Sequence, residues 1–263
     1  MLNKLLRYEL KVTARTLLPV GGGVLAFTVV TGLVNAVLNS QSNLPDMVEF
    51  LQALLLFAAG LALLLVVAAC VFVNVQRFYK LLGEQGYLML SLPVPAWQHI
   101  AAKLLCACLW TIGCVFYLGV CGSILSGSVP TSLVSTDNLD WPVAAAMLML
   151  VLLLLALLVE AYLEFYLACA IGGQFGQQRL LASIVSYFVL GFLEQILLVF
   201  LLIVVAFGSI QVNAGSWLEA FARVSPEATM VWMFLLVLLC IVLVDAIKWA
   251  IIQWLMTRRL NLV

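Results

Sequence analysis

The chain has 263 residues, of which 66% are hydrophobic and only 9% are charged, and its formal net charge is zero. Soluble globular proteins are roughly half apolar and a quarter charged, so this composition excludes that class and predicts an integral membrane protein. Because the charges are few, their positions along the chain say more than their sum. We expect a single all-α transmembrane domain over residues 1–263.

The N-terminal segment, residues 1–16, combines basic residues and leucines at helical spacing. The basic residues share one helical face and the leucines share the opposite face: Lys4, Arg7, Lys11 and Arg15 on the first, and Leu2, Leu6, Leu10 and Leu17 on the second. A helix of this kind is typical of one that lies in the membrane interface. A simple positive anchor for the first span is a compatible interpretation. We expect the segment to stay in the mature chain, because the apolar run that follows is longer than the core of a signal peptide.

Six apolar stretches follow, and each reaches the ~20 residues that a helix needs to cross the hydrocarbon layer. Their approximate ranges are 17–38, 50–75, 103–125, 142–171, 180–207 and 229–256. With both termini on the cytoplasmic side, ten of the twelve lysines and arginines are cytoplasmic, Arg223 is outside and Lys248 lies within a span. This distribution follows the positive-inside rule, so the sequence predicts six transmembrane helices with both termini cytoplasmic.

The segment between the second and third spans, residues 76–102, carries both charges and turn residues. Gly83 and Gly86 precede the short apolar run 87–92, and Pro93 stops any helix there because it lacks an amide hydrogen. Pro95 is placed to start the next helix. We therefore expect a short helix between two elbows, on the cytoplasmic side.

Within this segment the string RFYKLLGEQGYLMLSLPV, residues 77–94, resembles the first cytoplasmic loop of bacterial permease subunits of ATP-binding-cassette exporters, the type-two class. That loop typically reads close to FYKxLxGDEGYLxxTLPV, and Gln85 stands here where the pattern prefers a second carboxylate. In the family the loop contains a coupling helix that rests on a separate ATPase subunit. By resemblance, the ATPase-coupling residues are Arg77, Tyr79, Glu84, Tyr87, Leu88, Leu90 and Pro93.

The resemblance implies a six-span permease in the bacterial cytoplasmic membrane that works as a dimer, with itself or with a similar permease. Two ATPase subunits would hydrolyse ATP in trans, and the interfacial N-terminal helix would pack against them. The implied cargo is amphipathic or hydrophobic, such as an antimicrobial peptide, a drug or a lipid-like molecule.

The outer segment 208–228 contains a serine followed by an amphipathic pattern, with Trp217, Ala220, Phe221 and Val224 on one face. Exporters of the resembled class have re-entrant or interfacial helices at this place. An ordered outer loop with interface aromatics is the alternative, and the sequence leaves both open.

Two carboxylates share a face of the fourth span, because Glu160 and Glu164 are four residues apart. Counting from Trp141, we expect the pair near the cytoplasmic boundary, as a salt-bridged or interfacial anchor. Arg179 and Lys103 are candidate partners.

Three further charges fall inside later spans. Glu194 is expected beyond the bilayer centre, where it would line a conduit or be protonated and hydrogen-bonded between helices. Asp245 and Lys248 are three residues apart, and we expect them to neutralise each other within one helix.

Motifs of enzymes do not occur in the sequence. It contains no GxxxxGK[ST] phosphate loop, no HExxH and no GxSxG, and its seven cysteines lack metal or redox spacing. We therefore expect a transporter subunit rather than an enzyme, with no cofactor, no metal and no nucleic-acid partner. The single histidine, His99, falls in the loop and is expected to be solvated or to hydrogen-bond to the backbone. Two alternatives remain, an ATP-independent secondary transporter and a non-transporting membrane scaffold or sensor subunit.

Overall fold

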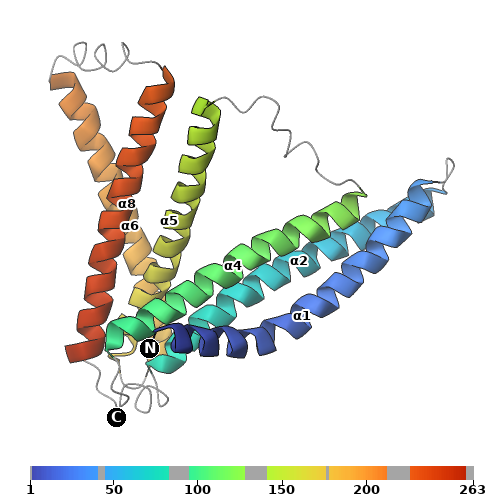
Figure 1. Cartoon of the computed structure of the whole chain (residues 1–263), viewed down its shortest axis with the longest axis horizontal. Helices are drawn as coiled ribbons and strands as arrows, with labels where there is room; N and C mark the ends of the chain where they lie inside the picture. The colour runs from blue at the N-terminus through green and yellow to red at the C-terminus, as the bar shows by residue number, and fades with distance from the viewer. Residues whose placement is uncertain are drawn as a thin grey trace. The chain divides into compact units, whose positions relative to one another are not determined.

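The computed structural model describes residues 2–40, 45–82, 95–127, 141–175, 178–211 and 226–258. These ranges contain long helices and no strand, which confirms the expected all-α class. The helices are α1 (Leu2–Asn39), α2 (Asp46–Leu81), α4 (Ala96–Ser126), α5 (Trp141–Gly172), α6 (Arg179–Gln211) and α8 (Pro226–Arg258) (Figure 1).

Among the described residues, six helices are long and apolar enough to cross a membrane, judged by length and composition. Each of these helices contains one of the six predicted spans and extends beyond it, as expected for a multi-pass membrane protein. In lipid a helix satisfies its own backbone hydrogen bonds, and this is why uniformly apolar segments of this length become helices.

Several helix ends follow from local sequence. α4 begins at Ala96, directly after Pro95, so the predicted start is confirmed to within one residue. Gly127, just past the end of α4, has φ +63°, the left-handed conformation that glycine adopts at low cost after a helix. α2 has Asp46 and Glu49 in its first turn, where carboxylates stabilise the positive end of the helix dipole.

The predicted interfacial segment and the first span form one continuous helix, α1. Pro19 lies inside it, and α1 changes direction along its length (Figure 1). A proline cannot donate the usual hydrogen bond and is a common cause of such a bend. The two predicted faces of the segment differ as expected, since its four basic residues are exposed and Leu17 is buried.

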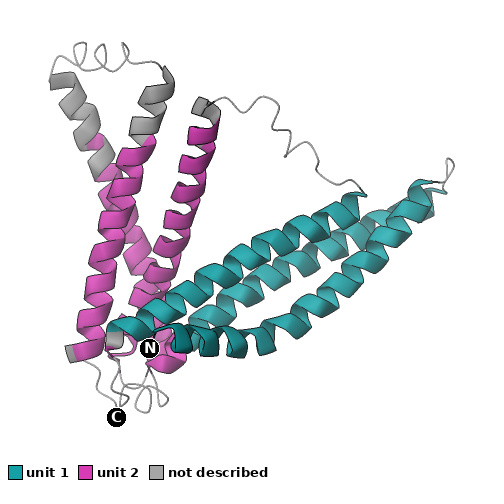
Figure 2. Cartoon of the chain, in the orientation of Figure 1, with its two compact units in different colours: residues 1–77, 97–136 teal, residues 78–96, 137–263 magenta. Residues whose placement is uncertain are grey.

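The chain divides into two compact units, which we describe separately (Figure 2). Unit 1 comprises residues 1–77 and 97–136, and unit 2 comprises residues 78–96 and 137–263. The division falls inside α2, between Arg77 and Phe78.

In unit 1, α1 runs parallel to α4 and antiparallel to α2. The Lys103–Glu9, Tyr117–Gly21 and Asn35–Leu125 contacts join residues separated by 94, 96 and 90 positions, and a nearly constant separation means parallel helices. Contacts from α2 have the opposite trend, because Arg77 bonds to Glu9 whereas Gln52 bonds to Asn35. The start of α1, the end of α2 and the start of α4 therefore lie at one end of unit 1.

Close packing of α1 on α4 depends on Gly32. A Cβ atom at this position would lie 2.7 Å from the carbonyl oxygen of Ile124 and 2.8 Å from its Cγ2. Small residues at helix interfaces allow such approach of two backbones in membrane proteins.

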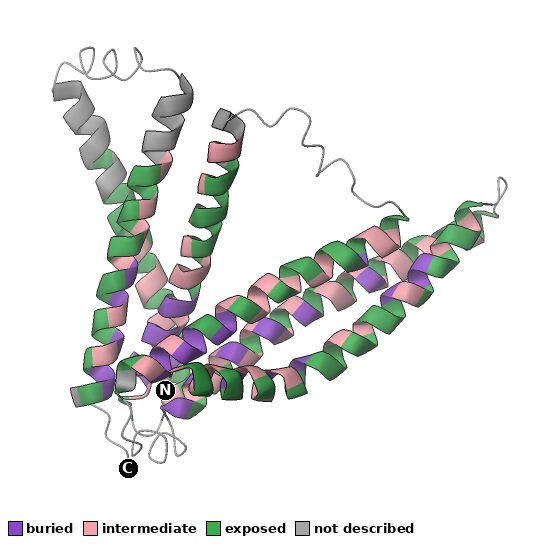
Figure 3. Ribbon diagram, viewed as in Figure 1, coloured by how far each residue is buried: buried purple, intermediate pink, exposed green. Residues whose placement is uncertain are grey.

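In unit 2, α5 contacts both α6 and α8. Its buried residues gather toward its C-terminal end, where Tyr162, Leu163 and residues 166–170 are all at most 6% exposed (Figure 3). Phe165 stacks on Tyr187 of α6 with ring centroids 4.6 Å apart. The last residues of α2 complete this core, since Phe78 stacks on Tyr166 with centroids 3.9 Å apart.

Candidate functional site

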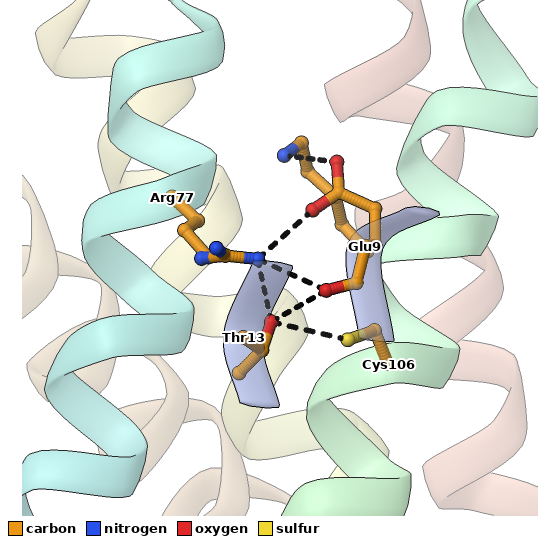
Figure 4. A network of polar contacts seen from close by, with 5 residues as sticks. Glu9, Thr13, Arg77 and Cys106 are labelled. Carbon is orange, nitrogen blue, oxygen red and sulfur yellow. Dashed lines mark hydrogen bonds and ion pairs between the residues drawn. The ribbon is translucent and has the colours of Figure 1, made fainter. Parts of the chain in front are cut away.

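One cluster of polar side chains lies in unit 1 and is centred on a carboxylate that the sequence analysis did not single out. We call it the Glu9 network, and it comprises Glu9, Thr13, Arg77, Lys103 and Cys106 (Figure 4). Glu9 is only 5% exposed and Thr13 is fully buried. Both lie on the face of α1 that carries the leucines.

Each carboxylate oxygen of Glu9 meets a different cation. Lys103 Nζ lies 2.9 Å from Oε1, and Arg77 Nη1 lies 3.3 Å from Oε2. Arg77 Nη1 also donates to the backbone carbonyl of Glu9, at 3.1 Å, and to the hydroxyl of Thr13. The Thr13 hydroxyl in turn donates to the Glu9 carbonyl at 2.8 Å and lies 3.6 Å from Cys106 Sγ.

The network holds charges that would be costly to bury singly. An ion taken out of water loses several kcal/mol of solvation, and only close pairing with further hydrogen bonds offsets this loss. Glu9 has two cationic partners, so removing its charge would leave two cations, one of them the 8% exposed Lys103, without their counter-ion. The arrangement therefore ties three helices together through a single side chain.

The Glu9 network also connects the two helices that the predicted coupling loop links. Arg77 lies in the last turns of α2, and Lys103 lies near the start of α4. Of the residues predicted to couple to an ATPase, Arg77 and Tyr79 lie on α2. The others fall outside the described residues: Glu84, Tyr87, Leu88, Leu90 and Pro93.

The predicted basic face of α1 is separate from this network. Lys4, Arg7, Lys11 and Arg15 are exposed, so their ammonium and guanidinium groups are available on the surface of unit 1. The sequence did contain a signal for Glu9, because it is the lone acidic residue before Asp46 and shares the leucine face of the helix. The four basic residues dominate the pattern, so it points to the exposed face of the helix rather than to Glu9.

His99 differs from the sequence expectation. Because α4 begins at Ala96, His99 lies in the first turn of the helix and is 1% exposed rather than solvated. Its Nε2 has no hydrogen-bond partner within the part of the chain that the structure describes.

A second cluster lies in unit 2, where α5, α6 and α8 each contribute charged residues. We call Glu160, Glu164, Glu194 and Lys248 the Lys248 cluster. Lys248 Nζ lies 2.5 Å from Glu194 Oε1 and 3.8 Å from Glu160 Oε1. The Lys248 side chain is 5% exposed, whereas those of Glu160 and Glu194 are 25% and 33% exposed.

Glu164 joins this cluster from α5. Its Oε1 lies against α6 at Gly191, where an added Cβ would come within 3.1 Å. Because Gly191 has no side chain, Glu164 of α5 fits against α6 one turn before Glu194.

These contacts correct one expectation about partners. Lys248 pairs with glutamates of two other helices rather than with Asp245, and no ion pair joins Asp245 to Lys248 in the described residues. Lys103, a candidate partner for Glu160, is bound to Glu9. The spacing of three along α8 allowed pairing within the helix, but the ammonium finds closer acceptors across the helix interface.

The two glutamates lie closer to one another along the helices than the sequence count placed them. Sequence counting placed Glu160 near the cytoplasmic boundary and Glu194 beyond the bilayer centre, yet both carboxylates bind the same ammonium. α5 continues to Gly172, so Glu160 lies twelve residues, roughly 18 Å, before its end. The two glutamates therefore lie at one level of unit 2.

The remaining site prediction concerns the segment 208–228. α6 extends to Gln211 and α8 begins at Pro226, so the ends of this segment are helical. Residues 212–225, which carry the predicted amphipathic pattern, lie outside the described residues. No group of three or more His, Cys, Asp or Glu side chains in the described ranges is placed to hold a metal ion.

A comparison of the chain with protein-family models, with curated protein sequences and with solved structures found no match. The family resemblance therefore rests on the loop sequence 77–94.

Proposed function

We propose that this chain is the membrane permease subunit of an ATP-binding-cassette exporter, with ATP hydrolysis on a separate partner subunit. The proposal places both termini and the loop 76–102 on the cytoplasmic side of a bacterial plasma membrane. It includes a dimer of permease chains and an amphipathic or hydrophobic cargo. The loop sequence that resembles a coupling loop is its main support.

One structural observation supports the proposal further, namely that Glu9 binds one cation on each of the two helices that this loop sequence connects. Arg77 lies near the end of α2, Lys103 lies near the start of α4, and both contact the same carboxylate of α1. A force applied to the loop would therefore be passed to α1, α2 and α4 through buried ion pairs. Rigid elements and charge networks are the usual carriers of coupling between distant sites.

The mechanism follows from these contacts. Closure of the ATPase partner would displace the loop residues 84–92 and bias the equilibrium between arrangements of the spans. Such coupling needs contacts that differ between the two states. In this proposal the contacts are the loop surface on the ATPase and the bonds of Arg77 and Lys103 to Glu9.

The test is recovery of the partner from the native membrane. The detergent-solubilised, affinity-tagged chain is expected to bring down a protein with a GxxxxGK[ST] phosphate loop in a complex of about 2:2 stoichiometry. Tyr87→Asp and deletion of residues 84–92 should each abolish the recovery. Met47→Asp is the matched control, because Met47 is 77% exposed and lies at the start of α2, outside both the loop and the N-terminal segment 1–16.

A chain that is recovered without an ATPase, while remaining monodisperse, would contradict the proposal. Loss of the partner in Met47→Asp as well would show that the loop is not the specific contact.

One observation favours a second candidate, a secondary transporter driven by an ion gradient. Such proteins have ionisable groups within the membrane on helices that move during transport, and the Lys248 cluster supplies charges from three helices. This candidate predicts efflux or uptake in proteoliposomes that contain only this chain and an ion gradient. The exporter proposal predicts no net transport there until an ATPase partner and ATP are added.

A further inference from the structure

We propose that the Lys248 cluster, together with Asp245, binds the cationic group of a lipophilic organic cation. The inference rests on the proposed function, because it names the charge of the cargo of that same permease. Negative charge exceeds positive charge in this part of unit 2, because four carboxylates lie near a single ammonium. The carboxylates belong to Glu160, Glu164, Glu194 and Asp245.

Asp245 provides the second, independent observation. The residue is 8% exposed, and its Oδ1 is buried without a hydrogen-bond partner in the described residues. Asp245 lies three residues before Lys248 on α8, so the two side chains share a face of that helix. Lys248 reaches Glu160 of α5 and Glu194 of α6 from this face, and Asp245 therefore lies on the side of α8 that meets these helices. An unpartnered buried carboxylate there is an acceptor without a donor.

The cluster is reachable from outside unit 2. The side chains of Glu160 and Glu194 are 25% and 33% exposed, although Lys248 beneath them is nearly buried. Around these carboxylates the helices expose apolar residues, such as Leu157 on α5 and Leu197 on α6, each one turn away. A ligand that fits this surface has a positive charge attached to an apolar body.

The geometry favours an organic cation over a metal ion. Metal ions need several ligand atoms converging within 2–2.6 Å, and no such group of carboxylates is present in the described residues. Lys248 occupies the position between Glu160 and Glu194 that a small ion would need. A diffuse cation interacts with carboxylates at longer range and needs no coordination shell.

The experiment measures binding of tritiated tetraphenylphosphonium to the full chain in nanodiscs of phosphatidylcholine. Tetraphenylborate, which has nearly the same shape and the opposite charge, is the matched ligand control. We expect saturable binding of the cation and none of the anion. The double variant Glu194→Gln, Asp245→Asn should weaken cation binding by at least about tenfold, because two nearby opposite charges are removed.

The matched protein control is the double variant Asp46→Asn, Glu49→Gln. Both altered residues are exposed and lie at the start of α2 in unit 1. This variant removes two negative charges, as the first double variant does. Its binding should equal that of the unaltered chain. Absence of saturable binding, or equal weakening in both double variants, would overturn the proposal.

A second measurement uses the unaltered chain, in case the first double variant does not fold. Dicyclohexylcarbodiimide reacts with carboxyl groups in apolar surroundings, and mass spectrometry locates the adducts. Tetraphenylphosphonium should reduce labelling of Glu194 and Asp245, and tetraphenylborate should not. Labelling that is unchanged by the cation would also overturn the proposal. Neither measurement involves the ATPase, so a negative result removes this site and leaves the exporter assignment to the recovery experiment.

Discussion

The ammonium of Lys103 lies 2.9 Å from the carboxylate of Glu9, although the two residues are 94 positions apart in the sequence. This contact and the ion pair from Arg77 join α1 to the end of α2 and the start of α4, the two helices that the loop sequence connects. The Glu9 network thus lies at the end of unit 1 from which the loop sequence extends.

Glu9→Gln should lower the stability of the detergent-solubilised chain by about 3 kcal/mol or more, because it leaves two cations without their counter-ion. Thermal unfolding is the measurement. Adding Lys103→Met should cost less than the sum of the two single changes, since the pair is then removed together. Lys4→Met, at an exposed position of the same helix, is the control. Additive effects of Glu9→Gln and Lys103→Met would contradict the coupling of these side chains.

Phe78→Ala should destabilise the protein by about 3–5 kcal/mol, the usual range for deleting a buried phenyl ring. Phe78 is fully buried and stacks on Tyr166, with ring planes 9° apart. Phe72→Ala on the same helix is the control, because Phe72 is 65% exposed. The unfolding midpoints of both variants in micelles would be compared, and equal midpoints would argue against this stack.

Gly32→Ala should be destabilising by about 1–3 kcal/mol, because the new methyl group would overlap the backbone of Ile124 and push α1 from α4. Gly22→Ala is the matched control on the same helix, where an added Cβ meets nothing within 4 Å. That change should stabilise α1 by up to about 1 kcal/mol, the difference in helix propensity. Thermal unfolding should therefore show opposite shifts for the two variants, and shifts of the same sign would contradict the close approach.

Lys248→Met should destabilise unit 2 by about 3 kcal/mol, because it removes the ammonium that Glu160 and Glu194 share. Adding Glu194→Gln should recover part of the loss by removing one unpaired carboxylate. The exposed Lys80 supplies the control, Lys80→Met. Urea or thermal unfolding would measure the three variants, and a double variant less stable than Lys248→Met alone would count against this pairing.

Local pattern in the sequence was sufficient for the helices themselves. Six apolar stretches predicted six long helices, and each is present in the described residues because a lipid-facing segment has to satisfy its own hydrogen bonds. Pro95 marked the start of α4, and the basic face of α1 is exposed as its spacing predicted. These properties depend on residues within a few turns of one another.

Partners across helices were not predictable in the same way. A helix that is apolar on nearly every side has no periodic stripe to mark its inner face, and α5 is of this kind. The pattern therefore did not reveal that Glu160 and Glu194 lie at one level, or that both bind Lys248.

The sequence by itself thus determined the class, the number and the extent of the spans, because the periodicity and apolar length of a helix are local properties. The tertiary structure decided which charges meet, because this depends on the register between helices. That register is set by close contacts such as Gly32 on Ile124 and Phe165 on Tyr187, whose members are remote in sequence or lie on different helices. Glu9 is the clearest example. Its helical spacing predicts which face of α1 it shares, but its two cationic partners come from α2 and α4 and depend on the fold.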